Sequence, residues 1–243
     1  MLFASFKARG NSVKILVISD IHGNLNAINA INEDADLVFC LGDLVNYGPN
    51  PKACIEKVRS LTDTIVRGNH DNAVGRNIDC GCSVQYRELS NAGKVFTDSV
   101  LTADEKNFLG NLPITQELEI EGKTFLLSHG SPSGDMYKYL KPDTSDEVLE
   151  DKLRNVHANF VFVGHTHFPM IRKIKGITMV NPGSVGQPRD GIPMASYALW
   201  EDGHIEIKRV PYDIEASVEE LKMTSIPPRK IEILARILRK GGM

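Results

Sequence analysis

The chain has 243 residues, of which 42% are hydrophobic and 24% are charged, as in a globular protein with a sizeable core. Its formal net charge is −3, whereas nucleic-acid-binding proteins are typically strongly basic. No apolar run reaches the roughly 18 residues that a membrane-spanning helix needs, and residues 1–12 lack the apolar block of a signal peptide. We therefore expect a cytoplasmic protein with neither a nucleic-acid nor a membrane partner.

The first half of the chain alternates predicted strands with predicted helices. Short β-rich apolar runs predict strands at residues 13–19, 36–41, 64–66, 123–128 and 159–163. Asn50 followed by Pro51 predicts a helix start, with the helix continuing to Leu61. Capping-box spacing predicts two more helix starts, at Thr102 with Glu105 and at Thr144 with Glu147. Such alternation is typical of an α/β layered domain.

The pattern changes after Gly164. Residues 170–175, 177–180, 195–200 and 204–210 predict successive strands with short turns, which we expect to form an antiparallel section that completes a second sheet. Two helices, near 214–223 and 228–240, are expected to close the chain. The second interleaves basic residues with Ile and Leu, which favours an amphipathic helix packed on the domain over a membrane or partner-docking helix. We expect one domain at 13–211 and a helical extension at 212–243 packed on it.

Four cysteines do not predict a disulfide framework in a chain of this size. Cys40 and Cys54 lie on apolar segments and are expected to be buried thiols. Cys80 and Cys82 lack a second pair at zinc-finger spacing. Free thiols on a loop are expected there, with a redox pair as the alternative.

Polar residues gather where the predicted strands end. In chain order they are Asp20, His22, Asp43, Asn69, His70, His129, His165 and His167, which include five of the seven histidines. Because ligand sites in α/β sheets lie at the carboxyl ends of strands, these segments can converge on one crevice. His157 and His204 lie elsewhere and are interpreted as ordinary structural residues.

The residue types at these strand ends indicate a metal centre. Carboxylate and amide oxygens mixed with imidazole nitrogens, and no thiolate, suit Mn²⁺, Fe or Zn²⁺ better than Ca²⁺. One carboxylate can bridge two cations, and ions roughly 3.5–4 Å apart can activate a water and neutralise a phosphate. Taken alone, Asp-x-His is typical of a helix cap and Gly-Asp of a turn. Their recurrence with Gly-Asn-His-Asp and Gly-His-Thr-His favours the metal centre over those structural alternatives.

These motifs resemble those of the calcineurin-like metallophosphoesterase superfamily over residues 13–211. The motifs are Asp20-x-His22, Gly42-Asp43, Gly68-Asn69-His70-Asp71, Ser128-His129-Gly130 and Gly164-His165-Thr166-His167. Residues 42–49 and 181–189 resemble the small prokaryotic phosphodiesterase branch. The resemblance implies an α/β fold, namely a four-layer αββα sandwich with two mainly mixed sheets.

The resemblance also implies a role for each motif residue. One metal ion would be bound by Asp20, His22, Asp43 and His167, and a second by Asp43, Asn69, His129 and His165, with Asp43 bridging the two. His70 would be the general acid, oriented by Asp71. The cofactors would be two divalent transition-metal ions, with Mn²⁺ expected and Fe, Ni²⁺ or Zn²⁺ as alternatives, and a bridging hydroxide would attack phosphorus.

One departure from the family pattern bears on the substrate. Protein serine/threonine phosphatases and their diadenosine-tetraphosphatase relatives carry Asp-Arg-Gly after the Gly-Asp motif, where this chain has Asn46-Tyr47-Gly48. Arg67 and Arg189 are candidates for contacting phosphate instead, with a salt bridge and a structural turn as the respective alternatives. Specificity is expected to depend on the cap-like segment 75–112.

We therefore predict hydrolysis of small phosphodiesters. The alternatives are a phosphomonoesterase or protein phosphatase that uses the same site, and a non-catalytic interaction module of the same fold. The expected partner is a small phosphoester substrate, and a homo-oligomer is left open.

Overall fold

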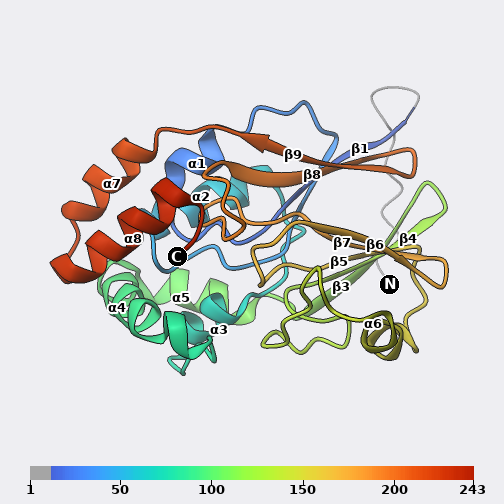
Figure 1. Cartoon of the computed structure of the whole chain (residues 1–243), viewed down its shortest axis with the longest axis horizontal. Helices are drawn as coiled ribbons and strands as arrows, with labels where there is room; N and C mark the ends of the chain where they lie inside the picture. Colours follow the sequence, from blue (N-terminus) through green and yellow to red (C-terminus); the bar gives the residue numbers. More distant parts are fainter. Residues whose placement is uncertain (1–11) are drawn as a thin grey trace.

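Two mixed β-sheets packed face to face form the centre of the computed structural model, which describes residues 12–243 (Figure 1). The first sheet has the order β2-β1-β8-β9 and contains β1 (Lys14–Ile18), β2 (Leu37–Cys40), β8 (Ala195–Glu201) and β9 (His204–Val210). The second has the order β3-β4-β5-β7-β6 and contains β3 (Thr115–Ile120), β4 (Lys123–Ser128), β5 (Phe160–Phe162), β6 (Met170–Ile174) and β7 (Ile177–Asn181). The signal-peptide prediction concerns residues 1–12, of which residues 1–11 lie outside the described part of the chain.

Alternation of side chains along the strands builds the layers. In β1, Ile15 and Val17 enter the core between the two sheets, together with Phe125, Phe162 and Trp200. Their neighbours Leu16 and Ile18 join the core on the outer face of the first sheet. One strand thus contributes to two cores, because successive side chains point to opposite faces of a sheet.

Helices cover both outer faces of the sandwich. On the first sheet, α1 (Leu25–Asn29) and α2 (Pro51–Leu61) supply Ile28, Ile55 and Val58 to the outer core. On the second sheet, Leu149 of α6 (Asp146–Leu153) packs against Leu126 and Val161. The layers follow the order helix, sheet, sheet, helix, so the predicted αββα sandwich with two mixed sheets is confirmed.

The remaining helices lie together at one end of the sandwich (Figure 1). They are α3 (Asn69–Gly75), α4 (Val84–Val100), α5 (Ala103–Asn111), α7 (Ile214–Lys222) and α8 (Pro228–Lys240). Side chains of α4, α7 and α8 share one apolar core that also contains Tyr47. The division of the chain at residue 211 into a domain and an extension stays a prediction.

The strands after Gly164 do not form one antiparallel section, and that expectation is wrong. β6 and β7 join the second sheet, where β7 runs parallel to β5. β8 and β9 join the first sheet, where β8 runs antiparallel to β1. The loop between β7 and β8 crosses from one sheet to the other. Residues 64–66, a predicted strand, contribute only an isolated bridge between Ile65 and Cys40.

Cys80 and Cys82 are joined by a disulfide in the loop between α3 and α4, so the expectation of free thiols there is wrong. Gly81 between them has a φ of 62°, which turns the chain back on itself and brings the two sulfurs together. Cys40 and Cys54 are buried free thiols, as predicted. None of the helices within residues 12–243 is long and apolar enough to cross a membrane.

Candidate metal centre

The predicted ligands come together, buried, between the two sheets at the carboxyl ends of their strands. Asp20 and His22 follow β1, Asp43 follows β2, Asn69 begins α3, His129 follows β4, and His165 and His167 follow β5. We refer to these seven residues as the metal centre. The convergence arises because β1 and β2 are parallel in one sheet, β4 and β5 are parallel in the other, and both pairs end at the same place.

Five of these ligands have a left-handed backbone, which non-glycine residues rarely adopt. The φ angles are 54° for Asp20, 48° for His22, 56° for Asp43, 67° for His165 and 63° for His167. Such conformations cost on the order of 1–3 kcal/mol each and occur where function requires them. Here they are held by hydrogen bonds between the loops, for example from the amide of His22 to the carbonyl of Asp43 at 2.9 Å.

Asp20, His22 and His167 form the first group of ligand atoms. The Nε2 atoms of His22 and His167 lie 3.1 Å apart. Oδ1 of Asp20 lies 3.3 Å from Nε2 of His167 and 3.8 Å from Nε2 of His22. Oδ1 of Asp20 is buried and has no hydrogen-bond partner among the described residues.

Asp43, His129, His165 and Asn69 form the second group. Oδ1 of Asn69 lies 3.1 Å from Nε2 of His129 and 3.0 Å from Nδ1 of His165. Oδ2 of Asp43 lies 3.2 Å from Nε2 of His129 and 3.8 Å from Nε2 of His22. Asp43 therefore lies between the two groups, where a bridging ligand would have to be.

Backbone carbonyls orient three of the imidazoles. Nδ1 of His22 donates to the backbone carbonyl of Val45 at 3.1 Å. Nδ1 of His129 donates to the carbonyl of Leu41 at 2.8 Å, and Nδ1 of His167 donates to the carbonyl of Gln187 at 2.6 Å. Each bond places the proton of the neutral ring on Nδ1 and leaves the Nε2 lone pair directed into the centre. Outer hydrogen bonds of this kind accompany metal-binding histidines in general.

The protonation states suit metal binding. Burial would raise the pKa of the Asp20 carboxyl, but interactions with His167 and His129 together lower it below its ordinary value. Burial lowers the pKa of His22 well below its ordinary value and lowers that of His165 to about 3. Burial also opposes protonation of His129, yet the adjacent Asp43 carboxylate raises its pKa to about 9. Ionised carboxylates, neutral imidazoles at His22 and His165, and an orphaned buried oxygen fit divalent metal ions. His129, with its raised pKa, would release a proton when a metal ion binds.

His70 faces the same centre, with its Nε2 4.0 Å from Oδ2 of Asp43. The structure corrects the expectation that Asp71 orients it. The Asp71 carboxylate instead accepts hydrogen bonds from the amides of Asp43, Leu44 and Gly68 at 2.7, 2.8 and 3.0 Å, because it lies in the first turn of α3. It ties the Asp43 loop to that helix.

Asn46 is the partner of His70. Its amide nitrogen lies 2.7 Å from Nδ1 of His70, while its Oδ1 accepts the amide proton of Tyr47 at 2.7 Å. The sequence offered a signal for this, since Asn46 lies in the segment that departs from the family's Asp-Arg-Gly pattern. Its role depends on a contact 24 positions along the chain that no local pattern predicts.

The two arginines predicted to contact phosphate lie in different surroundings. The guanidinium of Arg67 is buried and donates to the carbonyl of Gly110 at the end of α5. This contact is structural, although it is made to a backbone carbonyl and is not the salt bridge considered as the alternative. Arg189 lies beside the metal centre. Its guanidinium stacks on the ring of Tyr86, with 3.8 Å between Cζ and the ring centroid, and bonds to Oε1 of Gln187.

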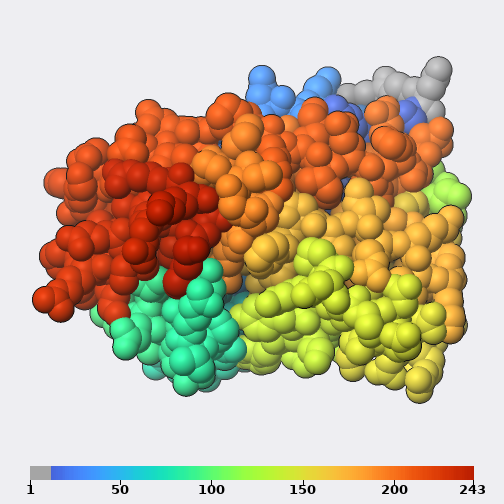
Figure 2. All heavy atoms as spheres, viewed as in Figure 1, coloured from blue at the N-terminus to red at the C-terminus, as the bar shows by residue number. Residues whose placement is uncertain are grey.

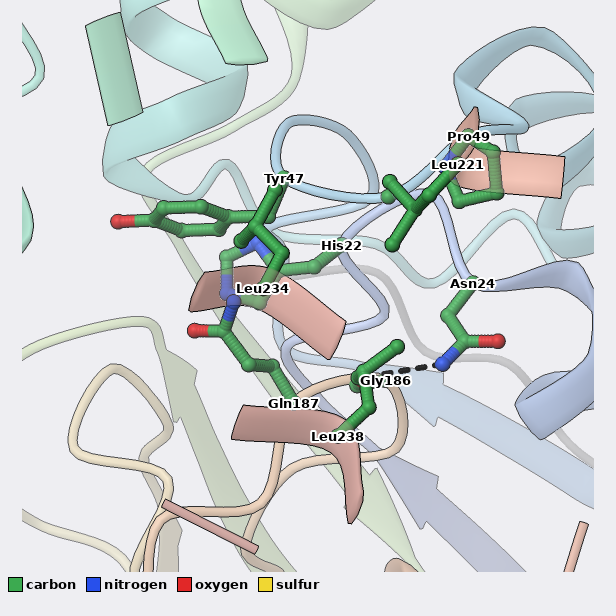
Figure 3. Close-up of a pocket in the computed structure, with 10 residues that line it drawn as sticks. His22, Asn24, Tyr47, Pro49, Gly186, Gln187, Leu221, Leu234 and Leu238 are labelled. Atoms are coloured by element: carbon green, nitrogen blue, oxygen red, sulfur yellow. Dashed lines mark hydrogen bonds between the residues drawn. The ribbon is translucent and has the colours of Figure 1, made fainter. Parts of the chain in front are cut away.

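The C-terminal helices close one side of the centre (Figure 3). Leu221 of α7 and Leu234 and Leu238 of α8 approach His22 and Gln187 around a cavity of about 10 Å³, room for about one water molecule. The sequence predicts that these helices pack on the domain, but it does not predict that they cover His22, a candidate ligand.

Comparison with known proteins agrees with this geometry. Residues 13–202 match the calcineurin-like phosphoesterase superfamily domain. Uncharacterized protein MJ0912 of Methanocaldococcus jannaschii is 37% identical over 238 residues, covering 88% of this chain and 93% of that one. Phosphodiesterase YfcE of Escherichia coli is 26% identical over 214 residues, covering 80% of this chain and 91% of that one.

Solved structures show the same fold. A metallophosphoesterase from Sphaerobacter thermophilus is 30% identical, with a TM-score of 0.78, covering 95% of this chain and 100% of that one. The hypothetical protein PH1004 from Pyrococcus horikoshii superimposes with a TM-score of 0.80 at 22% identity, covering 91% of this chain and 97% of that one. The chain therefore belongs to the calcineurin-like phosphoesterase superfamily.

Proposed function

We propose that this protein hydrolyses small phosphodiesters with the help of two divalent metal ions. Asp20, His22, Asp43 and His167 would hold one ion, and Asp43, Asn69, His129 and His165 the other. The observation that carries the proposal is a pair of buried groups whose candidate ligand atoms lie within 4.8 Å of one another, namely Asp20, His22 and His167, and Asp43, His129 and His165. Asp43 lies on the side of its group that faces His22. When bound, two such ions supply a hydroxide nucleophile at neutral pH and neutralise charge on the phosphate. Mn²⁺ is the expected ion, and Fe, Ni²⁺ and Zn²⁺ suit the same ligands.

His70 is assigned to the leaving group. Since Oδ1 of Asn46 is occupied by the amide of Tyr47, the side-chain nitrogen of Asn46 is the donor and Nδ1 of His70 accepts. The ring proton then lies on Nε2, the nitrogen that faces Asp43 and the metal centre. A proton held there can be given to the oxygen that departs from phosphorus.

Arg189 is assigned to the phosphate. Its guanidinium donates to Oε1 of Gln187 at 2.7 Å, and the backbone carbonyl of the same Gln187 accepts from Nδ1 of His167 at 2.6 Å, so Arg189 lies beside the centre. The stacking on Tyr86 and the bond to Gln187 fix the guanidinium before any ligand arrives.

Two observations support a diester over a monoester. Tyr47 occupies the place of the arginine that phosphoprotein phosphatases carry, so one arginine fewer is available for the extra charge of a monoester. YfcE, with which the chain shares 26% identity, is named a phosphodiesterase. No predicted ligand is missing from the centre, which argues against a non-catalytic module.

The test is hydrolysis by chelator-treated protein reloaded with Mn²⁺, Ni²⁺, Zn²⁺ or Mg²⁺. Bis(4-nitrophenyl) phosphate should be cleaved with a higher kcat/KM than 4-nitrophenyl phosphate. A preference for the monoester would favour the phosphatase alternative, and no hydrolysis with any ion would favour the interaction module. His167→Ala should abolish the activity, whereas the matched control His204→Ala, exposed on β9, should retain it.

A further inference from the structure

A groove of about 480 Å³ opens beside the metal centre. Four segments that are far apart in the sequence supply its aromatic and cationic lining: Tyr86 of α4, Tyr139 and Lys141 from the loop before α6, Phe168 after β5, and Arg189 after β7. Figure 2 shows α4, the loop before α6 and the C-terminal region bordering one another on one face of the molecule. The volume lies within the range of about 300–1,000 Å³ that small-molecule sites occupy.

The groove adjoins the metal centre. Thr166, between His165 and His167 in the chain, lines it. The ring of Tyr139 lies 4.0 Å from that of His165, centroid to centroid. A diester whose phosphorus is at the centre must direct its two substituents away from it, and this groove lies where one of them can go.

The residues that line the groove favour a flat ring system attached to a negatively charged phosphate. Aromatic faces stack on nucleobases without requiring a particular base. Arg189 and the exposed Lys141 attract phosphate and repel a cationic head group such as choline. Stacked on Tyr86, Arg189 itself presents a flat cation, which binds both a base and a phosphate oxygen.

We propose that this groove binds the nucleoside part of the substrate, so that the enzyme acts on small nucleotide esters. The inference rests on the proposed function. In the reaction, water adds to phosphorus, the bond from phosphorus to the leaving oxygen breaks, and that oxygen takes up the proton. The products are a nucleoside monophosphate and an alcohol, and no oxidant or second substrate is needed.

The test compares two esters with the same leaving group. Thymidine 5′-(4-nitrophenyl phosphate) and ethyl 4-nitrophenyl phosphate both release nitrophenolate, so they differ only in the group that the groove would hold. We expect kcat/KM to be at least about tenfold higher for the thymidine ester, mainly through KM. Phe168→Ala should reduce this ratio, and the control Lys123→Ala, exposed at the far end of β4, should not.

A binding measurement separates failure of the inference from failure of the proposed function. By calorimetry, adenosine 5′-monophosphate should bind the metal-loaded protein at least about tenfold more tightly than ribose 5-phosphate, which lacks the base. Equal kcat/KM for the two esters together with equal affinity for the two monophosphates overturns the inference and leaves the phosphodiesterase standing. Absence of hydrolysis of both esters refutes the proposed function, and the two affinities then decide whether the groove binds nucleotides.

Discussion

The Nε2 atoms of His22 and His167 face each other at 3.1 Å, and the Nδ1 atom of each ring donates to a backbone carbonyl. In the neutral rings both Nε2 atoms therefore carry lone pairs, and two lone pairs at this distance repel. Burial, together with the charge of Arg189, disfavours protonation of His167. A metal ion bound by both nitrogens removes the repulsion, so the folded chain should be more stable when metal is bound.

Metal addition should raise the melting temperature of the chelator-treated protein. At a metal concentration of about a hundred times Kd, binding to the folded state alone adds about 2.7 kcal/mol. For a chain of this length that corresponds to a rise of about 5–10 °C. Differential scanning calorimetry with and without Mn²⁺ measures it, and His167→Ala should show a smaller rise. An unchanged melting temperature at saturating Mn²⁺, Ni²⁺ and Zn²⁺ would contradict the metal centre.

Asp43→Asn should lower metal occupancy at both positions, because both groups of ligands share this carboxylate. Its Oδ2 lies near His22 and His129, while its Oδ1 accepts the amide proton of His70 at 2.8 Å. We expect metal content to fall from about two ions per chain towards zero, with a loss in kcat/KM of about 10²-fold or more. Elemental analysis measures the content, and Asp143→Asn, exposed before α6, is the control. Loss of only one ion with the other retained in full would exclude the bridge.

His70→Ala should retain its metal ions yet lose rate according to the leaving group. A positioned acid typically contributes about 10²–10⁴ in rate when the leaving oxygen needs a proton. A nitrophenolate departs without one, so the loss should be far larger for an alkyl or nucleoside leaving group. Asn46→Ala, which removes the amide that orients the ring, should show the same trend to a smaller extent. Equal losses on both kinds of ester, with metal content unchanged, would leave His70 with a positioning role only.

The sequence predicted those features that are encoded locally. The apolar runs before Asp20 and before the Gly-His-Thr-His segment predict strands, and the candidate ligands follow directly, because strand and candidate ligand are adjacent in the chain. The α2 and α8 boundaries, Pro51–Leu61 and Pro228–Lys240, followed from proline at the helix start and from the apolar pattern.

Features that depend on tertiary contacts could not be predicted in this way. Asp71 is next to His70 in the chain, yet it faces the amides of Asp43 and Leu44, because adjacent residues in a helix point in different directions. The partner of His70 comes instead from Asn46, on another loop. In the same way, the pattern of apolar residues within β7 and β8 does not show that the two strands belong to different sheets.

Glu33→Gln should destabilise the protein at neutral pH and much less in acid. Burial would raise the pKa of Glu33, but hydrogen bonds from Lys208, Tyr197 and Lys14 lower it from 4.5 to about 2. A lowered pKa in the folded state stabilises it above about pH 4.5, and this stabilisation is lost as the pH falls towards 2. Allowing for partial screening, we expect Glu33→Gln to lower the free energy of unfolding by about 1–2 kcal/mol at pH 7, which corresponds to a melting temperature about 3–6 °C below that of the wild type. Thermal unfolding between pH 7 and pH 2 measures it, and the exposed Glu119→Gln is the control. A difference that does not shrink in acid would contradict the ionic origin.

Gly68→Ala should disrupt the metal centre without straining its own backbone. Gly68 has a φ of −85°, which any residue adopts, so the effect must come from the added methyl group. A Cβ there would lie 2.0 Å from Oδ1 and 2.4 Å from the amide nitrogen of Asp43, so the bridging carboxylate would have to move. We expect a loss of about 1–3 kcal/mol in stability, from overpacking, and loss of metal from both positions.

Gly203→Ala is the control, because it strains the backbone without adding a steric clash. Gly203 lies in the β8–β9 turn at a φ of 80°, and no atom lies within 4 Å of the Cβ that the substitution would add. It should cost stability through its backbone alone and retain both ions. Elemental analysis and thermal unfolding of the two variants distinguish these effects, and wild-type metal content in Gly68→Ala would show that the Asp43 carboxylate does not require its observed position.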